Sequence, residues 1–280
     1  MGRPQAPPTF TRRWRAGRWE AAGDRLAAEE PLQLSLDGEP LSILMRTPGN
    51  DVELALGLLW GENVITSLDQ VSGVRISAEA EESEPRIAVA ADLVESNLVD
   101  VRLSGRVRRP QRSFLSSSAC GVCGATTIES LELDFPLLQP GPEVDPELLP
   151  KLSEALRERQ ALFEQTGGLH AAGLFATTGE LVILREDVGR HNAVDKVVGR
   201  ALLDGLVPAA GYLLVVSGRA GYEVVQKAIA AGIPLLAAVG APSSLAAATA
   251  MRFGMTLVGF LRDGRFNVYS APERLRGYVN

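Results

Sequence analysis

The chain has 280 residues, of which 46% are hydrophobic, so it holds enough apolar material for a substantial core in one large or two smaller domains. Its formal net charge of −6 argues against nucleic-acid binding as its main activity. Two cysteines are too few for a disulfide framework, so we expect a cytoplasmic protein.

The N-terminal segment carries basic and aromatic residues but no apolar stretch. Residues 1–19 are rich in proline and arginine and lack the apolar core of a secretory signal. Trp14 and Trp19 stand among arginines, a composition that suits contact with a partner. Because chain termini of this kind are more often poorly ordered, we assign residues 1–28 to a basic tail and expect it to be disordered or loosely docked.

Residues 29–112 have the pattern of a small α+β domain. Residues 30–49 predict a hairpin, because Leu32, Leu34 and Leu36 alternate with polar residues ahead of an Asp37-Gly38 turn. Asn50 or Asp51 is suited to cap the helix that follows. The further elements expected are this helix, ending near residue 61, and strands over residues 74–78, 86–90 and 98–103.

Residues 113–140 are expected to form a cysteine-containing loop and a proline-rich linker, and residues 141–280 an α/β domain. Apolar strands alternate with helices in the second region, which predicts a mixed or largely parallel sheet covered by helices on both faces. A charge-free stretch over residues 228–251 is long enough to cross a membrane, but glycines and prolines divide it, so no span is predicted. Strands are expected over residues 169–176, 181–185, 212–217, 234–239, 255–260 and 265–269, and helices over 145–162, 192–203, 222–231 and 244–253.

Polar residues follow several of these strands, at the sheet edge where ligands of such folds bind. Ser217-Gly218-Arg219 and Ser243-Ser244 place hydroxyls and amides at predicted helix starts, which suits phosphate binding, although such residues also serve as ordinary caps. Arginines in these loops can clamp pyrophosphate oxygens. They are Arg190, Arg219, Arg262 and Arg265.

Three further residues allow two interpretations each. His191 lies near Asp187, where the two form either a structural polar pair or part of a ligand site. His170, in an apolar strand, is expected to be a hydrogen-bonded core residue rather than a ligand contact. Phe260 either stacks on a base or fills the core, and the turn at Gly264 belongs either to a nucleotide site or to a plain surface hairpin.

Cys120 and Cys123 stand three residues apart, in a glycine-flanked loop that follows a basic run. If a helix begins just after them, its free amides and dipole favour a thiolate, the reactive form of cysteine. Three readings stay open: small buried residues or half of a zinc site, a thioredoxin-type redox pair, and a cysteine that carries a persulfide. The basic run comprises Arg102, Arg106, Arg108, Arg109 and Arg112.

Five motifs together resemble the formate dehydrogenase accessory sulfurtransferase family, FdhD, over nearly the whole chain from about residue 30. No single motif is specific, but the combination is. They are Cys120-Gly121-Val122-Cys123-Gly124, Gly167-Gly168-Leu169-His170-Ala171-Ala172, Glu186-Asp187-Val188-Gly189-Arg190-His191-Asn192-Ala193-Val194-Asp195-Lys196, Ser217-Gly218-Arg219, and Phe260-Leu261-Arg262-Asp263-Gly264-Arg265-Phe266-Asn267-Val268-Tyr269.

The resemblance implies a sulfurtransferase that passes persulfide sulfur from a cysteine desulfurase to the molybdenum cofactor of formate dehydrogenase, a bis(molybdopterin guanine dinucleotide). Cys120 is then the persulfide carrier and Cys123 a secondary thiol. The resemblance also implies a cytidine-deaminase-like fold for the large domain, a homodimer, and cofactor binding through the guanine nucleotide, for which GDP is a partial mimic. The implied cofactor contacts are Phe260, Leu261, Arg262, Asp263, Gly264 and Arg265, to which the loop arguments add Ser217, Gly218, Arg219, Arg190 and His191.

Two other functions compete with this one: a thiol–disulfide redox protein that uses both cysteines, and a non-catalytic chaperone that only holds the cofactor. We expect no zinc, because a zinc deaminase needs a His-x-Glu element ahead of a Pro-Cys-x-x-Cys pair. Here Ala119 replaces the proline, and no histidine precedes the cysteines.

Overall fold

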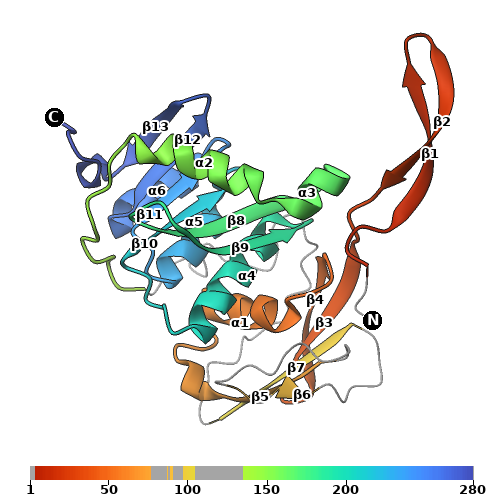
Figure 1. Cartoon of the computed structure of the whole chain (residues 1–280). Helices are drawn as coiled ribbons and strands as arrows, with labels where there is room; N and C mark the ends of the chain where they lie inside the picture. The colour runs from red at the N-terminus through yellow and green to blue at the C-terminus, as the bar shows by residue number, and fades with distance from the viewer. Residues whose placement is uncertain (1–3, 77–86, 88, 91–96, 105–134, 280) are drawn as a thin grey trace.

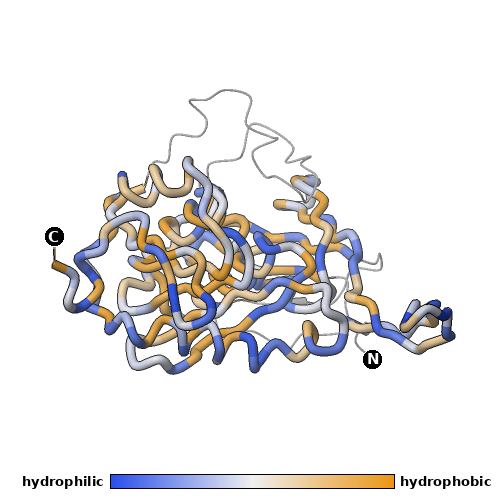
Figure 2. The backbone as a smooth tube through the Cα atoms, turned by 90° about the horizontal axis from the view of Figure 1, so that it is seen from above, coloured by the Kyte–Doolittle hydropathy of each residue, from blue (hydrophilic) through white to orange (hydrophobic). Residues whose placement is uncertain are grey.

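The computed structural model describes residues 4–76, 87, 89–90, 97–104 and 135–279, and these residues form a two-stranded ribbon, a five-stranded sheet and a six-stranded sheet (Figure 1). Helices lie between the two larger sheets and on the outer face of the six-stranded one. Figure 2 shows the most hydrophobic segments in the interior strands and the hydrophilic ones on surface turns and on the ribbon.

The five-stranded sheet has the order β4-β3-β7-β5-β6. Its first hairpin is confirmed: Leu32, Leu34 and Leu36 alternate into the core, each at most 4% exposed. Helix α1, which starts and ends where predicted, covers this apolar face. The elements are β3 (Glu30–Leu36), β4 (Glu39–Arg46), α1 (Asp51–Gly61), a short 3-10 helix η1 (Leu68–Gln70), β5 (Val71–Ile76), β6 (Val89–Ala90) and β7 (Leu98–Leu103).

The six-stranded sheet has the order β13-β12-β11-β10-β8-β9. Its elements are α2 (Leu148–Glu158), α3 (Ala161–Thr166), β8 (His170–Ala176), β9 (Leu181–Asp187), α4 (Arg190–Leu203), β10 (Tyr212–Val216), α5 (Tyr222–Ala230), β11 (Leu235–Ala238), α6 (Ser244–Phe253), β12 (Thr256–Arg262), β13 (Arg265–Ser270) and the 3-10 helix η4 (Pro272–Arg274).

This sheet is mixed rather than largely parallel. β10, β11 and β12 run parallel because helices α5 and α6 return the chain between them, whereas β8–β9 and β12–β13 are hairpins closed by tight turns and β8 runs antiparallel to β10. Helices α4, α5 and α6 pack on one face and α2 on the other, so alternate residues of each strand enter two separate cores.

Helices α1 and α4 meet at two glycines, which join the two halves of the chain. A Cβ atom on Gly57 would lie 1.9 Å from the carbonyl oxygen of Asp195, and one on Gly199 would lie 1.9 Å from that of Glu53. The helix backbones are therefore in direct contact, and no larger residue fits at either position. Leu203 of α4 also belongs to the core of the five-stranded sheet.

The prediction of a disordered tail is wrong for residues 8–25. They form the ribbon of β1 (Pro8–Arg15) and β2 (Arg18–Arg25), paired in continuous antiparallel register. The turn residues Ala16 and Gly17 both have positive φ, 48° and 84°, as in a two-residue hairpin turn. Composition suggested a tail, but the two strands pair across the Ala16-Gly17 turn. In the described part of the chain, no helix combines the length and apolar character that a membrane crossing requires.

Candidate functional site

One edge of the six-stranded sheet brings together the loop residues singled out from the sequence. The parallel strands β10, β11 and β12 end at this edge, β9 also ends there, and β8 and β13 begin there. Backbone hydrogen bonds connect three of the loops, from Gly240 N to Gly218 O (2.9 Å) and from Phe260 N to Gly240 O (3.1 Å). We call this the carboxyl edge. It comprises His170, residues 187–191, residues 217–219, residues 240–243 and residues 260–265.

The Ser217-Gly218-Arg219 loop is built for close backbone approach. The Ser217 hydroxyl accepts a hydrogen bond from Ala171 N at 2.8 Å, so the serine holds β8 to β10. A Cβ on Gly218 would lie 3.4 Å from Nδ1 of His170 and 3.7 Å from Cβ of Arg190. Gly218 therefore brings the histidine, the arginine and the loop backbone into one cluster. The sequence placed Arg190 and this loop at the edge, whereas His170, which was expected in the core, is only partly buried and lies beside them.

Arg190 is the first residue of α4, and the Nε atom of its guanidinium needs a hydrogen-bond acceptor. Its Nε is buried and finds no hydrogen-bond partner within the described ranges. The N-cap residue of α4, Gly189, has no side chain to cap the helix. A guanidinium with a buried free N–H, beside the positive end of a helix, suits an anionic group such as a phosphate.

His191 pairs with Glu223, not with Asp187. Its Nε2 lies 3.2 Å from a Glu223 carboxylate oxygen. Burial, followed by the charges of Arg190 and Lys227, lowers the pKa of His191 to about 3. The carboxylate acts in the opposite direction, but burial among cations dominates, so the ring is neutral at pH 7 and its N–H donates to Glu223. Burial and Arg190 also lower the pKa of His170, which is only partly buried.

Asp187 has a structural role. Its fully buried carboxylate accepts hydrogen bonds from Thr47 N, Gly189 N and the Asn192 amide and pairs with the Lys196 ammonium at 2.8 Å. Lys196 also donates to the Thr47 carbonyl. These bonds anchor the loop after β4 against the start of α4. The Asp187–His191 pair considered from the sequence is therefore replaced by Asp187–Lys196.

The β12–β13 hairpin contains one strained residue. Phe260 has φ 54°, a left-handed conformation that is unfavourable for a bulky side chain, at an irregularity in the β12–β13 pairing. Arg262 lies over its ring at 6.0 Å. Asp263 and Gly264 form the turn, and Leu261 is fully buried in the core, so its side chain is unavailable to a ligand. Arg262, Asp263, Gly264 and Arg265 are exposed.

A buried ion pair that the sequence analysis missed joins α4 to α5 beside the end of α1. Asp195 of α4 and Lys227 of α5 meet at 2.7 Å, and each side chain is at most 4% exposed. Burial raises the pKa of Asp195 to about 6, against the attraction of Lys227. Burial also acts to lower the pKa of Lys227, but Asp195 and Glu62 outweigh it and the net direction is upward. Both groups are therefore charged at pH 7. The signal in the sequence that could have revealed this pair is a charged residue on the otherwise apolar face of each helix.

Cys120 and Cys123 lie outside the described residues, so their surroundings stay a prediction. Among the residues that are described, no group of three or more histidine, cysteine or acidic side chains is placed to hold a metal ion. The expectation of no zinc at the cysteines remains untested.

Most of the chain matches the model of a known protein family. The FdhD/NarQ family model matches residues 27–276. The chain belongs to the FdhD/NarQ family. The ribbon of β1 and β2 precedes the matched region, whereas the carboxyl edge lies entirely within it.

Individual relatives support the same assignment. The chain is 45% identical to a sulfur carrier protein FdhD of Streptomyces avermitilis, over 94% of this chain and 93% of the relative. It is 44% identical to one of Sulfurisphaera tokodaii, over 90% and 92%. A crystal structure of a putative formate dehydrogenase accessory protein from Desulfotalea psychrophila superposes with a TM-score of 0.76 at 26% identity, over 97% of this chain and all of that chain.

Proposed function

We propose that this protein is a cytoplasmic sulfur carrier that takes persulfide sulfur from a cysteine desulfurase and delivers it to the molybdenum cofactor of a formate dehydrogenase. The observation that carries the proposal is the 45% identity, over 94% of the chain, to a protein named as a sulfur carrier. The geometry of the carboxyl edge supports it independently, because that edge suits the phosphates of a nucleotide-bearing cofactor.

In the loading step, the Cys120 thiolate attacks the outer sulfur of the donor's persulfide. A new S–S bond forms on Cys120, the S–S bond of the donor breaks, and the donor's cysteine leaves as a thiolate. The step needs a deprotonated Cys120, which the preceding run of arginines favours through its positive potential. The cofactor is the substrate that receives the sulfur.

The carboxyl edge fits the nucleotide end of that substrate. The Nε of Arg190 has no acceptor among the residues that the structure describes, and a phosphate oxygen supplies one. Gly218 brings the loop backbone against Arg190, where its amides can join the guanidinium in binding an anion, and exposed Arg262 and Arg265 add positive charge. The strained, half-buried Phe260 presents a ring at the same edge, where a guanine base can stack.

Mass spectrometry of the full chain after incubation with a cysteine desulfurase and cysteine tests the sulfur step. We expect one added sulfur on Cys120, loss of this adduct in Cys120→Ala, and retention in Cys123→Ala. A redox protein would instead require both cysteines equally. An active Cys120→Ala variant in formate dehydrogenase maturation would refute the assignment.

Calorimetry with GDP tests the nucleotide step separately. A charge-assisted hydrogen bond contributes about 1.5–3 kcal/mol, so Arg190→Ala and Arg262→Ala should each weaken binding roughly ten- to a hundredfold. Arg252→Ala is the matched control, because this exposed arginine lies in the last turn of α6, away from the carboxyl edge. If all three variants bind GDP as tightly as the wild type, the nucleotide binds elsewhere. Persulfide loading of Cys120 should survive in each variant.

A further inference from the structure

His170 lies at the carboxyl edge with an imidazole ring that has no hydrogen-bond partner among the described residues. It is the first residue of β8, where the sequence predicted a hydrogen-bonded core histidine. The residue is instead only partly buried. A Cβ on Gly218 would lie 3.4 Å from its Nδ1 atom, so this ring nitrogen lies against the loop that follows β10.

Charged groups approach this ring from two elements. Asp187 of β9 is opposite His170 in the strand pairing, but its carboxylate is already bonded to buried donors. Arg190 and His191 come from α4, and the loop after β10 contributes the uncharged Gly218. Burial, followed by the charge of Arg190, lowers the pKa of His170, so the ring is neutral at pH 7.

Arg190 and His170 meet at Gly218. A Cβ on this glycine would lie 3.7 Å from Cβ of Arg190 as well as 3.4 Å from the histidine ring. The Nε of Arg190 is buried and has no acceptor within the described ranges. Because both side chains flank the same glycine, a phosphate that bonds to the guanidinium lies beside the imidazole as well.

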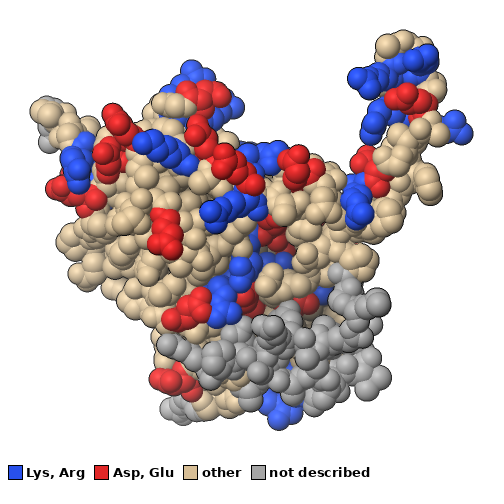
Figure 3. Space-filling model, in the orientation of Figure 1, with Lys and Arg blue, Asp and Glu red and all other residues tan. Residues whose placement is uncertain are grey.

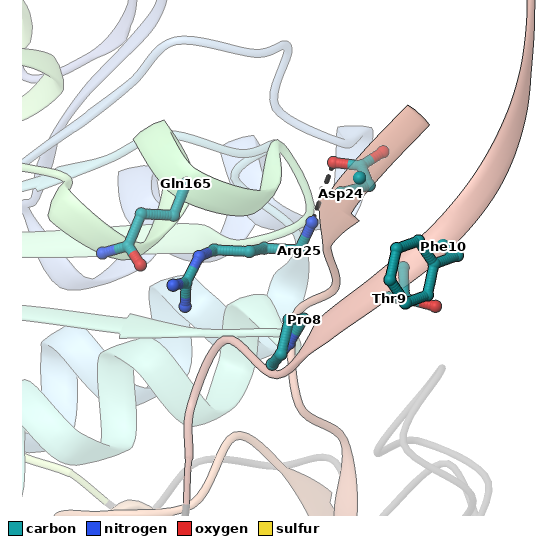
Figure 4. Close-up of a pocket in the computed structure, with 7 residues that line it drawn as sticks. Pro8, Thr9, Phe10, Asp24, Arg25 and Gln165 are labelled. Carbon is teal, nitrogen blue, oxygen red and sulfur yellow. Dashed lines mark hydrogen bonds between the residues drawn. The ribbon is translucent and has the colours of Figure 1, made fainter. Parts of the chain in front are cut away.

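Two other groups of arginines lack this combination. Those on the outer half of the β1–β2 ribbon are exposed (Figure 3), and water and salt screen their charge. Arg25, in the hollow between the ribbon and α3, donates to the Ala6 carbonyl at 2.9 Å and shares that hollow with Asp24 (Figure 4). Both histidines of the chain stand at the carboxyl edge. That edge is therefore the place where an arginine and an imidazole can hold one anion together.

We propose that His170 is a ligand-binding residue of the carboxyl edge, which donates a hydrogen bond to the phosphate held by Arg190 and takes up a proton from solvent as that phosphate binds. This inference rests on the proposed function, because the phosphate belongs to the nucleotide end of the cofactor. The bound phosphate offsets the charge of Arg190 and places negative charge beside the ring, and both effects favour the imidazolium. The resulting hydrogen bond is charge-assisted and stronger than one from a neutral ring.

Proton uptake makes nucleotide affinity depend on pH. A negative group at hydrogen-bond distance changes the ionisation equilibrium of a side chain about tenfold or more, and linkage requires that the proton change ligand affinity by the same factor. His191 makes no such contribution between pH 6 and pH 8, because its ring stays neutral and donates to Glu223. The pH dependence in this range therefore reports on His170.

Calorimetry of the full chain with GDP between pH 6 and pH 8 tests the proposal. In His170→Gln, an amide can still donate a hydrogen bond but cannot take up a proton, so only the titration of the ligand's own phosphate remains. We expect the ratio of wild-type to His170→Gln affinity to rise about tenfold from pH 8 to pH 6. Arg15→Ala, at the exposed tip of the ribbon, is the control and should keep the wild-type pH dependence.

Two readouts separate proton uptake from a structural role of His170. The heat of GDP binding to the wild type, measured in buffers of different ionisation enthalpy, counts the protons taken up and needs no variant. Magnetic resonance of the imidazoles follows each ring directly, because the chain has two histidines and His170→Gln assigns both signals. On saturation with GDP, His170 should titrate at a higher pH than in the free protein, while His191 stays neutral.

The outcomes distinguish this inference from the proposed function. If GDP binds but the titration of His170 does not change and no proton is taken up, the inference is overturned and the nucleotide proposal stands. If GDP does not bind to the wild type at any pH, both are overturned. An affinity ratio that is constant from pH 8 to pH 6 also overturns the inference.

Discussion

The contact between α1 and α4 makes a sharp prediction about Gly57 and Gly199. In an exposed helix interior, replacing glycine by alanine raises stability by about 0.5–1 kcal/mol. Here the new Cβ would lie 1.9 Å from a backbone carbonyl oxygen of the facing helix. An ordinary carbon–oxygen contact is about 3.3 Å, so the helices must separate by about 1.4 Å. The sign of the effect therefore reverses.

The size of the loss in stability depends on the contacts that are disturbed when α1 and α4 move apart. A gap of 0.5–1 Å already forfeits a quarter to a half of the packing attraction, and overpacking typically costs about 1–3 kcal/mol. Gly57 faces Asp195, whose carboxylate pairs with Lys227. Gly199 faces Glu53, whose carboxylate pairs with Arg185 at 2.5 Å. Because those buried pairs must also shift, we expect Gly57→Ala to lower the free energy of unfolding by about 2–4 kcal/mol, and Gly199→Ala likewise.

Urea unfolding followed by circular dichroism measures this. Gly211→Ala is the control, since a Cβ there meets nothing within 4 Å and its φ is not positive. The double variant should cost less than the sum of the single ones, because helices already separated by one alanine accept the second more easily. A Gly57→Ala variant as stable as the wild type, or more stable, refutes the backbone contact.

Three further predictions concern buried charge, acid stability and strain. Asp195→Asn should lower the free energy of unfolding by about 3–5 kcal/mol, because it leaves the Lys227 ammonium buried without its counter-charge; a loss below about 1 kcal/mol in urea titration contradicts this. The folded pKa of His191 is about 3, below the ordinary 6.5, so the folded state binds fewer protons and stability falls as pH drops below 6.5, by about 1.4 kcal/mol per unit until pH 3. His191→Gln should therefore move acid unfolding to lower pH; unchanged acid midpoints exclude the His191 contribution. Phe260→Gly relieves the left-handed strain, so its stability should stay within about 1 kcal/mol of the wild type while GDP affinity falls; thermal melts and calorimetry compare the two, and unaltered affinity removes the ring from the site.

Local pattern was sufficient for most elements of the fold. The alternating leucines of residues 32–36 and the helix after them appear as predicted, because burial on one face of a strand or helix imposes a period that adjacent residues display; the expected side-chain cap is absent, since Asn50 precedes the helix without capping it. The carboxyl edge was also predictable as a set of loops, since parallel strands end on the same side. The ribbon was missed because its Pro- and Arg-rich composition resembles a tail and Ala16-Gly17 is not one of the residue pairs typical of two-residue hairpin turns.

Pairings between distant residues were decided only by the tertiary structure. Sequence proximity suggested Asp187 for His191, but β9 directs the aspartate toward Thr47 and Lys196 while α4 turns the histidine toward Glu223. Nothing near Gly57 in the chain reveals that its Cα faces the backbone of Asp195, because that contact depends on how α1 crosses α4. A sequence determines which residues are buried through local periodicity, but which buried charges meet is fixed by the packing of elements far apart in the chain.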